Sequence, residues 1–357
     1  MPLTSLAILS CAGSGKTTEI VGMSSGASTG RSLLVTYTRN NTEEIRAKFY
    51  AKFGFIPHGC DVDTWFSFLL THFVRPYQRQ FRSERIGQMA WHNGVSTTGI
   101  AKTDPNYYFT PKGSIYRDKV SAFGVEANAK SRGKVVNRLK QIYSTIYIDE
   151  FQDLAGWDFE IVELLLRSGI QVVLVGDHRQ HTFKTNDSTR FKKYAGEGVL
   201  KLIEMWKSQG LCEIEDRTKN HRGCQAICDL ADYIFPHTSR MTSGLSVSTA
   251  HDGVFQIKSK HVDAYCALFH PQILRWDVRT TCGGRAAMNF GASKGLGFDR
   301  VLIFPNGSIS KFLEKNDMTA IASAKAKLYV GVTRARYSVT FVLDKACAVP
   351  GIAPFEP

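Results

Sequence analysis

A loop near the N-terminus constrains the fold of this chain more than any other stretch. The apolar run LAIL, residues 6–9, is followed by SCAGSGKTT and then by a helical pattern. Glycines and small residues that end in Lys-Thr, between a buried strand and a helix, let backbone N–H groups wrap a polyphosphate. The loop therefore predicts a P-loop domain in which Lys16 reaches the phosphates and Thr17 offers its hydroxyl to Mg²⁺.

A second motif supplies the acids that a P-loop needs. In YIDEFQD, residues 147–153, Asp149 ends a predicted buried strand and suits Mg²⁺ coordination. Glu150 beside it could orient and deprotonate an attacking water. Because two adjacent acids at the end of a buried strand are costly unless a cation is near, the pair makes nucleotide hydrolysis the expected chemistry.

Short apolar runs alternate with helical patterns along the whole chain. Runs of this kind are typical of buried parallel strands, and amphipathic helices are expected at 40–54 and 157–169. The alternation predicts a doubly wound α/β fold. The expected strands are 6–9, 32–37, 144–149 and 172–177, then a second series at 211–215, 254–258, 286–290, 300–304 and 338–343.

Charge points to a polyanion as partner, since the 357 residues carry a formal net charge of +13. Residues 71–143 hold thirteen Lys and Arg against four Asp and Glu, a surplus of +9. Interleaved with them are aromatic residues that include Phe81, Trp91, Tyr107, Tyr108, Phe109, Tyr116 and Phe123. Two interpretations of this segment stay open. It is a groove for single-stranded nucleic acid, or it is a solvated basic face with a small aromatic core of its own.

The remaining composition is that of a globular protein of two ordinary domains, with 43% hydrophobic residues. No window approaches the roughly 18 to 20 uncharged apolar residues of a membrane span, and no signal segment is apparent. We therefore expect a cytoplasmic protein without a membrane. The eight cysteines are scattered and form no C-x-x-C pair, so reduced thiols are expected.

Taken together, the motifs of this chain resemble those of UvrD/Rep-type superfamily 1 DNA helicases. They occur in the order that this family has, across residues 8–343, in a minimal form. The motifs are AGSGKT (12–17), LLVTYTRNNTEEIRAKF (33–49), DTWFSFLL (63–70), DEFQD (149–153), VGDHRQ (175–180), NHRGCQAICDLA (220–231), SKGLGFDRVLIF (293–304) and LYVGVTRAR (328–336).

The resemblance implies two RecA-like P-loop NTPase domains, each a mostly parallel sheet flanked by helices, with ATP in the cleft between them. We expect the first domain at 1–198, with a small basic subdomain inserted at about 71–143. The second is expected at 199–357. The interval between the motifs at 220–231 and 293–304 is too short for the large insertion that this family carries in its second domain.

For the nucleotide, the resemblance implies roles for residues of both domains. Gln180 would sense the γ-phosphate, and Arg222 and Arg334 would act as arginine fingers, which can contribute about 10³ to 10⁵ in rate. Gly295 would approach the phosphates and His221 the adenine. The implied contacts within the loop are Ala12, Gly13, Ser14, Gly15, Lys16, Thr17 and Thr18.

For the nucleic acid, the resemblance implies contacts to a single strand. The family usually places a stacking Trp two residues after the position of Phe183, where this chain has Thr185. At about 1–3 kcal/mol per stacked base, that loss could weaken the grip needed for stepping. The implied strand contacts are Tyr37, Thr38, Arg39, Trp65 and Phe183.

Two functions follow from the resemblance and stay open. The first is an ATP-dependent DNA helicase or translocase that moves on single-stranded or partly duplex DNA. The second is a regulatory ATPase subunit that senses DNA or nucleotide and controls a nuclease, because small UvrD-like proteins of this kind resemble those paired with OLD-family nucleases in Gabija-like antiphage systems. A third alternative is an RNA-directed enzyme, since nothing in the sequence reads the 2′-hydroxyl.

Overall fold

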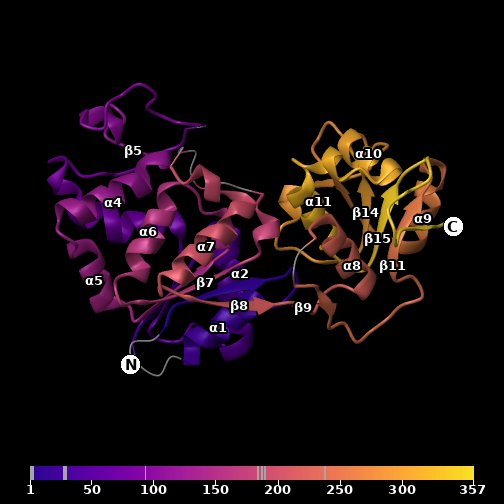
Figure 1. Ribbon diagram of the computed structural model, residues 1–357, viewed down its shortest axis with the longest axis horizontal. Coiled ribbons are helices and arrows are strands. Elements are labelled where there is room, and N and C mark those ends of the chain that lie inside the picture. Colours follow the sequence, from indigo (N-terminus) through magenta and orange to yellow (C-terminus); the bar gives the residue numbers. More distant parts are fainter. Residues whose placement is uncertain are drawn as a thin grey trace. The chain divides into compact units, whose positions relative to one another are not determined.

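A computed structural model describes residues 4–26, 30–92, 94–182, 185, 188, 190–236 and 239–357 (Figure 1). The chain divides by its contacts into two compact units. The first comprises Met1–Leu9, Lys16–His178 and Phe183–Glu215, and the second comprises Ser10–Gly15, Arg179–Thr182 and Asp216–Pro357. By its contacts, the loop Ser10–Gly15 therefore belongs to the second unit, although the residues on both sides of it, up to Leu9 and from Lys16, belong to the first.

The first unit is built on a six-stranded sheet in the order β3-β2-β6-β7-β1-β8. Every pair from β3 to β1 is parallel. Parallel strands are covered on both faces, and β2 and β6 are accordingly buried along their whole length. The strands are β1 (Leu6–Ser10), β2 (Ser32–Thr36), β3 (Cys60–Thr64), β6 (Thr145–Asp149), β7 (Gln171–Gly176) and β8 (Glu213–Arg217).

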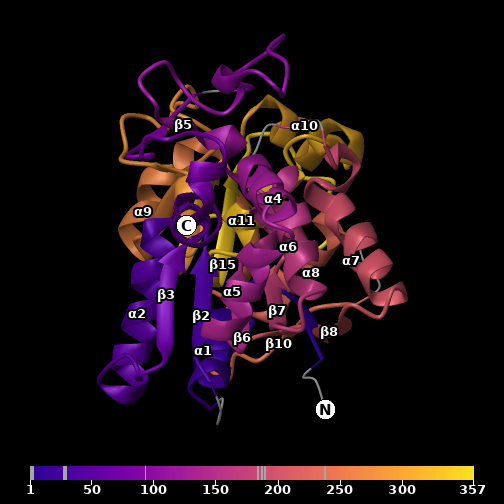
Figure 2. The ribbon, with the colours of Figure 1, turned by 90° about the vertical axis from the view of Figure 1, so that its left-hand side faces the viewer.

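Helices cover both faces of this sheet (Figure 2). On one face α1 and α2 pack through Ile20, Val21, Ile45 and Phe49. On the other face α3 to α7 form the larger core. The helices are α1 (Lys16–Gly26), α2 (Arg39–Phe53), α3 (Trp65–Phe68), α4 (Val120–Lys130), α5 (Lys134–Ile142), α6 (Trp157–Leu166) and α7 (Val199–Ser208).

The basic segment 71–143 leaves the first sheet after α3 and returns to it at β6. Several of its aromatic rings pack on one another: the ring centroid of Phe123 lies 4.3 Å from Phe81, 5.4 Å from Tyr108 and 5.5 Å from Phe109. For these rings the small aromatic core is the correct interpretation. The segment also contains the short parallel pair β4 (Met89–Ala90) and β5 (Ile115–Tyr116).

The second unit has its own six-stranded sheet, in the order β13-β12-β14-β15-β11-β16, with all neighbours parallel. Helices α8, α10 and α11 share the core on one face, and α9 packs on the other. The elements are β11 (Gly253–Ile257), β12 (Gln272–Arg275), β13 (Met288–Asn289), β14 (Phe298–Phe304), β15 (Ala335–Val342), β16 (Ala353–Pro354), α8 (Gln225–Ile234), α9 (Val262–Phe269), α10 (Gly307–Lys315) and α11 (Lys325–Val332). A separate short pair joins β9 (Lys219–Asn220) to β10 (Thr242–Ser243).

These two sheets confirm the predicted fold class, an α/β protein with two RecA-like units that each carry a mostly parallel sheet flanked by helices. The strands expected at 6–9, 32–37, 144–149, 172–177, 254–258, 300–304 and 338–343 are present as β1, β2, β6, β7, β11, β14 and β15. Across the described residues, each helix is too short or too polar to cross a membrane.

The boundary between the units differs from the expected one at 198/199. Residues 199–215 belong by their contacts to the first unit. The reason is packing, because Leu202, Ile203 and Trp206 of α7 are buried in the first core. The strand expected at 211–215 for the second sheet is also corrected, since β8 lies beside β1 at the edge of the first sheet.

A buried histidine holds the C-terminal segment on the second unit. The His251 ring is 6% exposed and is stacked at 4.2 Å on Phe255 and at 4.1 Å on Phe269, with Phe355 at 4.7 Å. Its Nε2 shares a hydrogen bond of 3.0 Å with the Tyr265 hydroxyl. Burial first, and then the positive charge of Arg300, lower the pKa of His251 to about 4 against the opposing effect of Asp252.

This pKa predicts that the second unit loses stability in acid. Below the ordinary value of 6.5 the unfolded chain gains a proton that folded His251 resists, so the free energy of unfolding falls between pH 6.5 and about 4. The loss is on the order of 2–3 kcal/mol. His251→Phe keeps a stacking ring without the titration, so urea unfolding at pH 7 and pH 5 should differ less for this variant than for wild type. A difference in the free energy of unfolding between pH 7 and pH 5 as large for His251→Phe as for wild type would contradict this prediction.

Candidate functional site

In the first unit, the P-loop lysine meets the acid pair. Lys16 Nζ lies 3.2 Å from Glu150 Oε1, and the Thr17 hydroxyl donates to Asp149 Oδ2 at 3.2 Å. The sheet brings them together, because β1 leads to α1, β6 ends at Asp149, and only β7 separates these parallel strands. Carboxyl ends of parallel strands share one edge of a sheet, which is where α/β proteins bind ligands.

Both acids of this pair are buried, Asp149 to 4% exposure and Glu150 to 9%. Burial first, and then the charge of Glu150, raise the pKa of Asp149, whereas Lys16 lowers it. Positive charge stabilises adjacent buried acids of this kind, and Lys16 supplies such a charge.

The backbone at Glu150 is held in an unusual conformation. Its φ of 56° and ψ of 38° lie in the left-handed region, which residues other than glycine seldom adopt. Its carboxylate accepts from Gln152 Nε2, and its backbone N–H donates to Asp149 Oδ1 at 2.9 Å. Strained residues of this kind are common at functional sites, where surrounding contacts over-determine them.

The loop residues Ser10–Gly15 belong to the second unit, and their shape requires glycine. Gly13 has φ 73° and Gly15 has φ 82°. A Cβ at Gly13 would lie 2.3 Å from Asn220 Oδ1, so even alanine would clash. The carbonyl of Gly13 accepts from His221 N at 2.9 Å, and Ala12 N donates to the Tyr329 hydroxyl at 3.4 Å.

The second unit also joins Gln180 to one of the two expected arginine fingers. Arg334 Nη2 donates to Gln180 Oε1 at 3.2 Å, and both side chains are 2% exposed. Arg334 donates further to the carbonyls of Val330 at 3.0 Å and Leu296 at 3.2 Å. The guanidinium of Arg334 is therefore fixed by several acceptors at once.

The other residues expected near the nucleotide are more accessible. Arg222 is half-buried and donates from Nη1 to the carbonyl of Thr333 at 3.3 Å. His221 is exposed, and Gly295 has φ 86°. Thr18 is exposed on α1 and accepts from Lys48 Nζ at 3.2 Å.

Three of the expected strand contacts follow β2 directly. Tyr37 is half-buried, Arg39 is exposed, and the Thr38 hydroxyl caps α2 by accepting from Asn41 N at 3.2 Å. Phe183 lies outside the described residues. These placements leave Tyr37 and Arg39 accessible at the carboxyl end of a parallel strand.

Trp65, another expected strand contact, is enclosed in the core of the first unit. Trp65 is 1% exposed, and its indole N–H donates to Asp158 Oδ1 at 2.8 Å. A ring enclosed in this way has no face for a base. No local pattern in the sequence indicates this burial, because the hydrogen-bond partner of the ring, Asp158, is 93 residues away in the chain.

Asp158, which the motifs did not single out, is the centre of a buried network. It is 1% exposed and accepts from Trp65, from the hydroxyls of Ser121 and Thr185, and from Ala155 N at 3.3 Å. Burial raises the pKa of its carboxyl, and these donors act against the rise. Thr185, at the position where a stacking Trp was expected from the resemblance, is therefore tied inward and 1% exposed.

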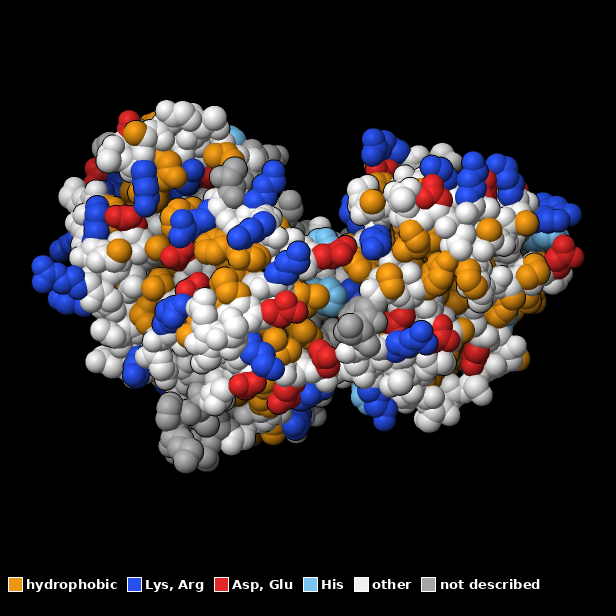
Figure 3. Space-filling model, in the orientation of Figure 1, with side chains coloured by type: hydrophobic (Ala, Val, Ile, Leu, Met, Phe, Trp, Pro, Cys, Tyr) orange, Lys and Arg blue, Asp and Glu red, His pale blue; other side chains and the backbone are white. Residues whose placement is uncertain are grey.

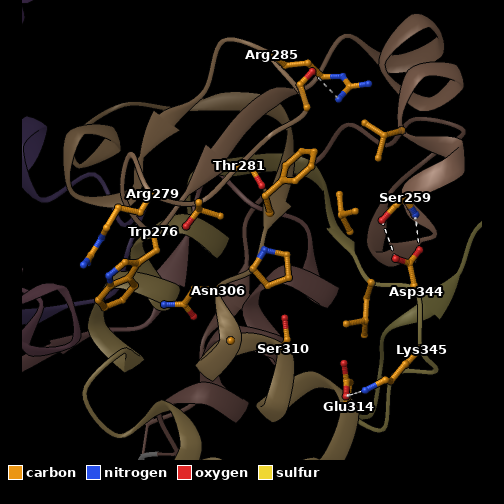
Figure 4. A pocket seen from close by; sticks show the side chains of 18 of the residues that line it. Ser259, Trp276, Arg279, Thr281, Arg285, Asn306, Ser310, Glu314, Asp344 and Lys345 are labelled. Carbon is orange, nitrogen blue, oxygen red and sulfur yellow. Dashed lines mark hydrogen bonds and ion pairs between the residues drawn. The ribbon is translucent and has the colours of Figure 1, made fainter.

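A separate pocket of about 950 Å³ lies in the second unit at the carboxyl ends of β12, β14 and β15 (Figure 4). The cations that line it are paired with acids: Lys345 with Glu314 at 3.0 Å, and Arg285 with Asp263. Asp344 accepts from Ser259. The pocket is polar and balanced in charge, and of its lining residues only Phe304, the last residue of the motif at 293–304, belongs to a motif.

Comparison with known proteins supports the motifs. Residues 116–192 match the family model of the UvrD/REP helicase N-terminal domain. This match confirms the resemblance that the motifs carry. A comparison with curated protein sequences finds no match.

Among solved structures, the chain is similar to the PRRSV helicase, with 14% identity and a TM-score of 0.45, over 95% of this chain and 52% of that one. It is also similar to Arterivirus nonstructural protein 10, a helicase, with 13% identity and a TM-score of 0.47, over 95% and 59%. The chain is also similar to a complex of Arterivirus nonstructural protein 10, a helicase, with DNA. The identity is 12% and the TM-score 0.46, over 95% of this chain and 60% of that one. The chain thus spans about half to three fifths of these helicases.

The Asp158 network predicts that Trp65 serves stability alone. Trp65→Phe removes one donor from a buried carboxylate, so the free energy of unfolding should fall by about 1–3 kcal/mol in urea titrations. The affinity of the folded variant for a single-stranded oligonucleotide should not change. Trp276→Phe, a half-buried tryptophan of the second unit, is the matched control. If Trp65→Phe bound the oligonucleotide more weakly at an unchanged free energy of unfolding, the prediction would be contradicted and Trp65 would contact the strand.

Proposed function

We propose that this chain, a UvrD-like helicase of superfamily 1, is an ATP-driven motor that couples hydrolysis to movement on single-stranded or partly duplex DNA. The observation that carries the proposal is the ion pair of 3.2 Å between Lys16 and Glu150. A triphosphate would compete for the same ammonium group, because phosphate oxygens are strong acceptors for it. Its arrival would release the Glu150 carboxylate to act as general base on water.

The residues present fit a magnesium nucleotide. The Asp149 carboxylate and Thr17 hydroxyl, 3.2 Å apart, are the hard oxygen donors that Mg²⁺ prefers. Mg²⁺ in such sites usually keeps phosphate and water oxygens as its other ligands, so two protein oxygens would be enough to hold it beside a nucleotide. When bound, Mg²⁺ would neutralise charge on the phosphates.

The loop itself also fits a phosphate. The Ser14 hydroxyl is buried and has no hydrogen-bond partner among the described residues. Gly13 and Gly15, one on each side of Ser14, both have left-handed backbone conformations. Backbone N–H groups in such a turn form an anion-binding concavity. We include Ala12 and Thr18 in this proposed cradle.

The second unit would contribute the groups that respond to hydrolysis. Arg222 and Arg334 would stabilise charge that develops on the γ-phosphate, as arginine fingers do. Gln180 is bonded to Arg334, so a change at the phosphate would move both side chains together. His221 would contact the adenine by stacking, and Gly295 would approach the phosphates with its backbone.

For the DNA, the proposal rests on charge and on the residues that follow β2. A net charge of +13 favours binding to a polyanion that weakens as salt rises. Tyr37, Thr38 and Arg39 offer a ring, a hydroxyl and a cation within three consecutive residues. Phe183 completes the set of proposed strand contacts.

A second candidate is a regulatory ATPase subunit that acts with a nuclease of the OLD family. Thr185 favours it, because this side chain is 1% exposed and bonded to Asp158, where a stacking ring would help a motor grip its strand. Strand displacement by the chain alone supports the motor. ATP hydrolysis without displacement, combined with an altered rate of an added OLD-family nuclease, supports the regulator.

The proposed base predicts a specific defect. Glu150→Gln should lower the turnover of ATP by about 10²- to 10⁴-fold, because the amide cannot accept the proton, and should leave ATP binding intact. Lys16→Ala should lose ATP binding itself. The measurements are steady-state phosphate release, with and without single-stranded DNA, and nucleotide binding by filtration. Glu204→Gln and Lys201→Ala, on the exposed face of α7, are the matched controls. Full hydrolysis by Lys16→Ala would exclude the P-loop assignment.

A further inference from the structure

One aromatic side chain of the inserted segment behaves differently from the others. Trp91, just after β4, is 71% exposed, whereas Tyr108, Phe109 and Phe123 are at most 7% exposed. Exposure of so large an apolar ring costs free energy, and large exposed apolar groups often mark binding sites. Trp91 is therefore exposed, whereas these three rings belong to the aromatic core of the segment.

Trp91 is not isolated on the surface of the first unit. The Phe66 ring meets it edge-on, with centroids 6.2 Å apart, and Tyr37 lies 6.1 Å from Phe66. The Arg117 guanidinium sits 5.7 Å from the centre of the Trp91 ring. Three segments far apart in sequence thus bring rings and a cation to one place.

We propose that Trp91 is a base-stacking residue for a single-stranded nucleic acid and that Arg117 beside it contacts the backbone phosphate. The proposal rests on the proposed function, since it concerns the same strand. It adds two residues from the inserted segment that the motifs do not contain. In this arrangement Trp91 supplies the stacking ring that Thr185 does not.

Charge and position favour a nucleic acid over a protein as the occupant. The segment that carries Trp91 has a surplus of +9, and Figure 3 shows Lys and Arg side chains scattered among hydrophobic ones over the first unit. Tyr37 and Arg39 follow β2 at the edge where parallel strands end. An exposed ring next to a guanidinium matches a base next to its phosphate, which is how single strands are held without sequence preference.

The test uses the full chain and a fluorescein-labelled oligothymidylate of about 15 nucleotides, which spans a typical site. Trp91→Ala should raise the Kd by about 5- to 100-fold, as expected for the loss of one stacked base. Tyr50→Ala is the matched control, because Tyr50 is 57% exposed near the far end of α2 and should bind as wild type does.

An oligonucleotide of the same length made of abasic sites distinguishes base stacking from phosphate binding. Wild type and Trp91→Ala should bind it equally, because it offers phosphates without bases. Arg117→Gln should reduce the slope of log Kd against log salt by about one phosphate contact, and Trp91→Ala should leave the slope unchanged. If Trp91→Ala fails to fold, Trp91→Phe decides: oligothymidylate should quench the tryptophan emission of wild type and quench this variant less.

Each failure has its own meaning. Trp91→Ala binding oligothymidylate as tightly as wild type would overturn the stacking role and leave the proposed motor in place. An equal loss on the abasic strand would also overturn it, because the contact would then not be to a base. Wild type failing to bind either strand would overturn the proposed function and this inference together.

Discussion

The buried acids at the end of β6 are the constraint on which the rest of the molecule depends. Asp149 and Glu150 are 4% and 9% exposed, and a pair of acids so placed is tolerated only beside positive charge. Lys16 provides that charge at 3.2 Å. For the contact to exist, β1 and β6 must end at the same edge of one parallel sheet, which in turn requires helices on both faces to cover the strands.

The parts of the fold that surround this contact could be predicted because their signals are local. Strands β1, β2, β6 and β7 are continuous apolar runs, since both of their faces are buried. By contrast, β3 has the sequence CDVDT and lies at the edge of the sheet, and β12 has only four residues, so neither had such a run. The position of β8 depended on pairing with β1, about 200 residues earlier, which no local pattern records.

The roles of side chains were harder to predict than the strands, because they too depend on partners that are distant in the chain. Trp65 lies in a motif from which we expected a contact with single-stranded nucleic acid. Instead its indole donates a hydrogen bond to Asp158 in the core, as the hydroxyls of Ser121 and Thr185 also do. The aromatic residues between 71 and 143 look alike in sequence, but several of them pack on Phe123, whereas Trp91 stays exposed. Whether a ring packs or faces solvent depends on partners distant in the chain, and only the structure supplies them.

The central claim is that the acids at the end of β6 exist to receive a metal-bound nucleotide. Calorimetric titration of ATP into the wild-type chain, with Mg²⁺ and again with EDTA, tests it most directly. The account predicts tight binding with Mg²⁺, much weaker binding in EDTA, and loss of that difference in Asp149→Asn. Equal ATP affinity in the presence and absence of the metal for the wild-type chain would contradict it.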